Sequence, residues 1–218
     1  MQQCVPSARN RLINVAWLHR GNKFESENYE VFKPIRNELD LSDNDSIDNF
    51  INKYKNMVFD VIINNAGINP LNCLEDIKEL DLNETIQINL KAPLKIIKGF
   101  AENMKAQNYG RIVNISSIWS IVSKEKRIVY SISKTGLNGL TKSSAVELAK
   151  YNILVNSVCP GYVNTELTFK NNTPEDIEKV IKNIPLCRLA EPEEISELVF
   201  FLSSNKKLLP IFFTSPKK

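Results

Sequence analysis

The fold is decided by a stretch that runs from Gly110 to Glu166 and reads GRIVNISSIWSIVSKEKRIVYSISKTGLNGLTKSSAVELAKYNILVNSVCPGYVNTE. Its first part, Arg111 to Ile115, is a β-branched run typical of a buried parallel strand, and Ser117 follows where that strand would leave the sheet. A proline-free segment rich in Ser, Ala, Leu and Lys then extends to about Lys150, which predicts a helix. A second apolar run, Ile153 to Cys159, predicts another strand of the same parallel sheet.

Tyr130 and Lys134 lie four residues apart near the start of the predicted helix. Positions i and i+4 share a helix face, so we expect the phenol and the ammonium to lie side by side. A free tyrosine titrates near pH 10, so proton transfer near neutral pH asks for a pKa lower by roughly 2 to 3 units, which the lysine charge could supply. The hydroxyl of Ser117 could hold a carbonyl or alcohol oxygen against the phenol. A tyrosine and a lysine at this spacing also form a common surface pair, so the pair alone leaves both interpretations open.

Ordered motifs over roughly residues 40–204 resemble the short-chain dehydrogenase/reductase family, most closely the branch that contains the 3-oxoacyl-carrier-protein reductases. The motifs are Asn64-Asn65-Ala66-Gly67, Ser117 with Tyr130-Ser131-Ile132-Ser133-Lys134, Pro160-Gly161-Tyr162-Val163-Asn164-Thr165, and the segment from Pro185 to Ile195. This resemblance implies a Rossmann-like, doubly wound parallel sheet in a three-layer α/β/α domain. It also implies an NAD(P)-dependent oxidoreductase that interconverts a carbonyl and an alcohol, assembled as a homo-dimer or tetramer through the long helices around residues 75–107 and 130–150.

The resemblance assigns catalytic roles to Asn89, Ser117, Tyr130 and Lys134. Tyr130 would protonate the carbonyl oxygen while Ser117 orients it. Lys134 would lower the phenol pKa and hold the ribose of the cofactor. Asn89 would anchor a proton-relay water through a local kink, whereas an asparagine inside a helix otherwise points to solvent.

The resemblance also assigns residues to the binding of NAD or NADP. They are Asp40, Leu41, Asn65, Ala66, Gly67, Tyr130, Lys134, Pro160, Gly161, Val163 and Thr165. Two of these assignments have a structural alternative: an aspartate in the position of Asp40 is commonly a helix cap, and the turn at Asn65 could simply brace neighbouring strands. The choice between NAD and NADP stays open, as does the substrate, because residues 166–185 read equally as a substrate lid or as a surface insertion.

The first part of the chain, residues 1–28, departs from the family pattern T-G-x-x-x-G-x-G, whose glycines let backbone N–H groups approach the pyrophosphate. The segment from Pro6 to Ile13 can be laid in register with this pattern, but Ser7, Arg11 and Ile13 then replace the glycines. Few apolar residues precede it, so we expect an atypical or truncated start with an incomplete first strand. With this register, little NAD(P)H binding is expected at micromolar concentrations. The alternative to an active oxidoreductase is a non-catalytic interaction subunit or a fragment of a once-active reductase.

The other end, residues 205–218, is expected to be an atypical tail of one domain that spans residues 1–218. The last strand of the family and its D-G-G ending are missing there, and only Leu208 to Phe213 offers an edge strand.

Composition fits a single domain with a sizeable core, since 43% of the 218 residues are hydrophobic. The net charge of +3 gives no reason to expect a nucleic-acid partner. The scattered cysteines and the single histidine leave no metal-ligand set and indicate free thiols in a reducing compartment, so we expect a cytoplasmic protein. The cysteines are Cys4, Cys73, Cys159 and Cys187. Neither a membrane span nor a signal peptide is indicated.

Overall fold

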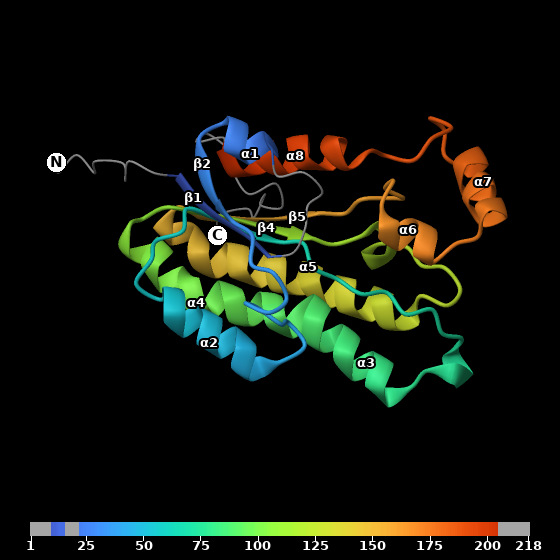
Figure 1. Ribbon diagram of the computed structural model, residues 1–218, viewed down its shortest axis with the longest axis horizontal. Helices are drawn as coiled ribbons and strands as arrows, with labels where there is room; N and C mark the ends of the chain where they lie inside the picture. Colours follow the sequence, from blue (N-terminus) through green and yellow to red (C-terminus); the bar gives the residue numbers. More distant parts are fainter. Residues whose placement is uncertain (1–9, 16–21, 205–218) are drawn as a thin grey trace, which may run out of the picture.

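A five-stranded parallel sheet lies between two layers of helices in the computed structural model, which describes residues 10–15 and 22–204 (Figure 1). The strands follow the order β2-β1-β3-β4-β5 across the sheet. They are β1 (Asn10–Val15), β2 (Tyr29–Phe32), β3 (Val61–Asn64), β4 (Gly110–Ile115) and β5 (Ile153–Val158). The chain order reverses between β1 and β3, and in such doubly wound sheets ligands bind beyond the carboxyl ends of the strands near that point. The expected Rossmann-like architecture is therefore confirmed.

Helices cover both faces of the sheet (Figure 1). One face carries α2 (Asn44–Tyr54), α4 (Ala92–Ala106) and α5 (Ile128–Leu148), and the other carries α1 (Asn22–Ser26) and α8 (Pro192–Ser204). The chain leaves β5 into α6 (Glu166–Lys170) and α7 (Pro174–Asn183). The remaining helical segments are η1 (Leu74–Asp76), α3 (Glu79–Ile86), η2 (Gln87–Lys91), η3 (Ile118–Ser120) and η4 (Ala149–Tyr151).

Each face of the sheet has its own hydrophobic core, because successive side chains of a strand point to opposite faces. In β4, Ile112 packs into the core beneath α2, α4 and α5, whereas Val113 packs into the core beneath α1 and α8. All six residues of β4 are buried, so its sequence lacks the regular alternation of polar and apolar residues that a strand with one exposed face shows.

The structure corrects the register assumed for the N-terminal segment. Arg11 and Ile13, placed by the sequence at glycine positions, lie inside β1, where Ile13 pairs with Ile62 of β3 and is fully buried. The first strand is therefore present inside the sheet, between β2 and β3. Ser7 lies outside the described residues, as do residues 16–21, which follow β1, and the tail from residue 205 that includes Leu208 to Phe213. The first helix after β1, α1, has only five residues.

The long helix predicted over residues 75–107 is interrupted at η2, a π-helical turn. Within it the N–H of Ala92 donates to the carbonyl of Gln87, five residues back. Pro93 gives the physical reason, because in a regular α-helix its ring would clash with the carbonyl of Asn89, four residues earlier. The wider turn removes this clash and places Asn89 at the break, as the resemblance implied.

Candidate active site

A cavity of about 390 Å³ opens beyond the carboxyl ends of β3, β4 and β5. Turns that leave these strands line it, together with the first turns of α5 and the start of α6. The sequence-predicted site residues that line it are Asn65, Gly67, Ser117, Tyr130, Lys134, Pro160, Gly161, Val163 and Thr165. Segments distant in sequence thus line one cavity.

Tyr130 and Lys134 both lie on the cavity side of α5 and are nearly inaccessible, with 8% and 3% of their surfaces exposed. The ammonium nitrogen of Lys134 lies 5.7 Å from the centroid of the Tyr130 ring, so the expected side-by-side arrangement is present. Nζ also donates a hydrogen bond of 2.7 Å to the carbonyl of Ile115, at the end of β4. Burial lowers the pKa of Lys134 to about 8.

The pKa of Tyr130 is raised from its ordinary value, chiefly because burial disfavours the phenolate. A hydrogen bond with Ser117 and the positive charge of Arg127 oppose this rise. The expectation that Lys134 would depress the phenol pKa is thus not met in this structure. Arg127 was missed by the sequence analysis, although it lies only three residues before Tyr130, at the N-cap of the helix that carries Tyr130.

Asn89 is fully buried and fastens two segments next to the cavity. Its Oδ1 accepts a hydrogen bond from the N–H of Ile68 at 2.9 Å, and its Nδ2 donates to the carbonyl of the same residue at 2.9 Å. Nδ2 also donates to Ser133 Oγ on α5 at 2.9 Å. Gly67 allows this close approach, since a Cβ there would lie 3.2 Å from Lys134 Nζ and 3.4 Å from Asn89 Oδ1.

Three predicted cofactor residues do not line the cavity: Asp40, Leu41 and Ala66. The carboxylate of Asp40 accepts hydrogen bonds from the N–H and hydroxyl of Ser42 and from Arg36 Nε, and these contacts hold its pKa at about 2. Leu41 and Ala66 pack in the core beneath α2, α4 and α5. Asp40 lies in the connection between β2 and α2, and the cap of α2 is Asp43.

A second cavity, of about 610 Å³, adjoins the first and shares Trp119, Gly161 and Tyr162 with it. The rings of Trp119 and Tyr162 meet edge to face, with centroids 6.0 Å apart. Its other lining is largely apolar and comes from η3 and from α7 with the residues after it. Residues 166–185 therefore line both cavities, which is the arrangement that a substrate lid requires.

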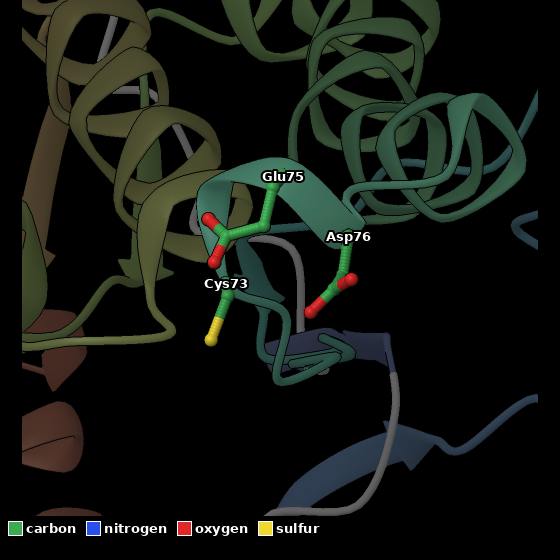
Figure 2. A group of neighbouring side chains, drawn as sticks. All are labelled: Cys73, Glu75 and Asp76. Atoms are coloured by element: carbon green, nitrogen blue, oxygen red, sulfur yellow. The ribbon is translucent and has the colours of Figure 1, made fainter.

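Elsewhere, Cys73, Glu75 and Asp76 gather at η1, with one ligand atom from each within 4.8 Å of the others (Figure 2). Both carboxylates are exposed, and such surface groupings are common without a metal. Among the described residues, no helix is long and apolar enough to cross a membrane.

The cavity fits the nicotinamide end of a dinucleotide cofactor. Among the described residues, Lys134 Nζ has one hydrogen bond, so two of its three N–H donors stay available for ribose hydroxyls. A Cβ added at Gly161 would meet no atom within 4 Å, which leaves open space over this turn.

Comparisons with known proteins agree with this geometry. A family model described as enoyl-(acyl carrier protein) reductase matches residues 17–208. An oxidoreductase of Thermotoga maritima is 38% identical over 152 residues, and the match covers 67% of this chain but only 61% of that protein's length. The 3-oxoacyl-[acyl-carrier-protein] reductase FabG of Aquifex aeolicus is 37% identical over 171 residues, which cover 77% of this chain and 68% of the relative. Among solved structures, ElxO with NADP bound is 25% identical, with a TM-score of 0.81 and coverage of 92% of this chain and 94% of that one.

Proposed function

Because the chain belongs to the short-chain dehydrogenase/reductase family, in the branch that resembles the 3-oxoacyl-carrier-protein reductases, we propose that it interconverts a carbonyl and an alcohol with NAD or NADP. The observation that carries this function is the convergence of Ser117, Tyr130 and Lys134 on one buried cavity. NADP in the ElxO structure supports the choice of cofactor class.

In the reducing direction, a carbonyl compound, NAD(P)H and a proton give an alcohol and NAD(P)+. The cofactor, when bound, supplies the hydride to the carbonyl carbon. Tyr130 gives its phenolic proton to the carbonyl oxygen, and Ser117 donates a hydrogen bond to the same oxygen. The raised pKa of Tyr130 keeps the phenol protonated before reduction, as a proton donor must be.

Lys134 holds the cofactor ribose in this proposal and replaces the proton that Tyr130 loses. Its pKa of about 8 suits this task, because the ammonium can then release a proton near neutral pH. Asn89 anchors the relay water beside Lys134, a role supported by the position of both side chains near Gly67, where a Cβ would lie 3.2 Å from Lys134 Nζ and 3.4 Å from Asn89 Oδ1. The remaining cofactor contacts are assigned to Asn65, Gly67, Pro160, Gly161, Val163 and Thr165 around the cavity, whereas adenine contacts by Asp40, Leu41 and Ala66 stay predictions.

We also propose that the protein is one cytoplasmic domain over residues 1–218 that assembles as a homo-oligomer. Exposed apolar side chains on α4 and α5 support this assembly: Leu94, Ile132 and Val146 are 48%, 51% and 58% exposed. These helices are the ones through which the resemblance implies oligomer contacts.

The test of this function is the oxidation of NADH or NADPH that depends on an added carbonyl substrate. Tyr130→Phe deletes one hydroxyl and keeps the ring, so circular dichroism and oligomeric state should not change. Its turnover should fall at least 100-fold, the lower range for the loss of general acid catalysis. A phenylalanine variant with activity close to that of the wild type would contradict the proton-transfer role.

A titration of NADH and NADPH by fluorescence tests the cofactor separately. The expectation of weak binding depended on Arg11 and Ile13 as loop residues, and both belong to β1. Saturable binding of either nucleotide is therefore expected, with a segment other than residues 6–13 next to the pyrophosphate. The absence of saturable binding for both would overturn the proposed reaction.

A further inference from the structure

Three buried polar atoms without a hydrogen-bond partner belong to residues that line the cavity of about 390 Å³. They are Asn69 Oδ1, Arg127 Nη1 and Tyr162 Oη. A buried donor or acceptor that lacks a partner costs about 1 to 3 kcal/mol, so native proteins rarely leave several together. Because all three residues line the same cavity, a ligand that reaches these atoms there would supply the missing partners.

Arg127 dominates this group because it carries a full charge and only 4% of its surface is exposed. It is the N-cap residue of α5, three residues before Tyr130. None of the ion pairs in the described part of the chain includes Arg127, and the only acidic residue of the cavity lining, Glu166, is exposed at its rim. A buried guanidinium without a counter-ion is strongly unfavourable, so the cavity requires an anion.

We propose that the substrate is an oxo acid whose carboxylate binds Arg127 while its carbonyl oxygen meets Tyr130 and Ser117, an inference that rests on the function proposed above. The planar guanidinium accepts a carboxylate through two parallel hydrogen bonds, which fixes its orientation. Arg127 and Tyr130 are three residues apart at the start of α5 and both line the cavity, so one small substrate can contact both side chains. Short 2-, 3- and 4-oxo acids carry a carboxylate and a carbonyl in such a small molecule.

Asn69 and Tyr162 extend the same recognition to further polar groups. Asn69 Oδ1 can accept a hydrogen bond, and the hydroxyl of Tyr162 can donate or accept one, so both suit hydroxyl substituents of the substrate. An uncharged acyl thioester would leave Arg127 without a counter-ion. The substrate class therefore differs from the thioesters implied by the name of the Aquifex relative.

The test compares pyruvate, acetoacetate and levulinate with their methyl esters, each with NADH and NADPH. The wild type should prefer at least one acid over its ester by tenfold or more in kcat/KM. Arg127→Gln should lower this acid-to-ester ratio by 10-fold to 100-fold. Arg127→Lys keeps the charge without the planar guanidinium, so its ratio should lie between those of the wild type and Arg127→Gln. A change in folding or in the pKa of Tyr130 would affect acid and ester alike, so the ratio isolates carboxylate binding.

Lys142→Gln is the matched control, because it removes one positive charge from an exposed position on the same helix. It should leave the ratio at the wild-type value. A ratio equal in the wild type and Arg127→Gln would overturn the inference, as would a wild type that prefers all three esters.

Binding without cofactor separates this inference from the proposed reaction. Trp119 lines the cavity, so its fluorescence can follow titration with the same acids and esters. Tighter binding of an acid than its ester, weakened at least tenfold in Arg127→Gln, supports the anion site even where no reduction occurs, and then only the reductase function fails. No binding of the three acids, or equal binding by the wild type and Arg127→Gln, refutes the anion site.

Discussion

Replacement of Lys134 by methionine should flatten the pH dependence of stability at alkaline pH. The folded protein holds the pKa of this lysine at about 8, against the ordinary value of 10.5. Between these values the unfolded chain binds a proton that the folded chain has lost, so the free energy of unfolding increases with pH. Each unit of difference contributes about 1.36 kcal/mol, so the gain from pH 7 to about 9.5 is about 2 kcal/mol.

Urea denaturation at several pH values in this range measures the effect. The wild type and Lys134→Met should diverge as the pH rises, with the wild type gaining about 2 kcal/mol relative to the variant. The interval ends below pH 10 because Tyr130, whose pKa is raised, contributes with the opposite sign above it: the unfolded phenol loses its proton first. Tyr130→Phe keeps Lys134 and should retain the rise. Parallel profiles for the wild type and Lys134→Met would refute the assignment of this titration to Lys134.

Two glycines of the helices on the same face of the sheet should respond to alanine in opposite directions. A Cβ at Gly99 of α4 would lie 2.7 to 2.9 Å from three side-chain carbons of Ile51. Gly99→Ala should therefore lower the free energy of unfolding by about 1 kcal/mol, even after its gain in helix propensity, and Ile51→Val should restore part of this loss. A Cβ added at Gly139 of α5 would meet no atom within 4 Å, so Gly139→Ala should raise the free energy of unfolding by about 1 kcal/mol. Chemical denaturation measures both; a stabilised Gly99→Ala or a destabilised Gly139→Ala would contradict these packing distances.

The central strands and α5 were predictable because their signals are local. A β-branched run for β4 and a spacing of four residues between Tyr130 and Lys134 depend only on strand and helix geometry, and the structure places them as expected. The cavity lining follows in the same way, since turns after neighbouring parallel strands meet at one edge of the sheet.

Strand β1 could not be recognised, because its pairing with β2 and β3 is set by tertiary contacts. Its apolar residues are Leu12, Ile13 and Val15, in a short segment that also contains two asparagines and an arginine. Arg127 was not predicted for a related reason: it lines the cavity together with residues between 160 and 172, which lie far along the chain. Pro93, in contrast, was a local sign of the break at η2 that the sequence analysis did not use.

The π-helical turn at η2 makes the candidate site depend on the length of the chain as well as on its residues. Such a turn accommodates one residue more than an α-helix of the same span. Loss of Leu90 or Lys91 would rotate Asn89 together with α3 by about 100° around the helix axis relative to α4, since an α-helix has 3.6 residues per turn. Asn89 would then point away from Ile68 and Ser133 even if no side chain of the site were replaced. In an alignment of related chains, a single gap at this turn would therefore separate sequences able to build this corner of the cavity from those that cannot.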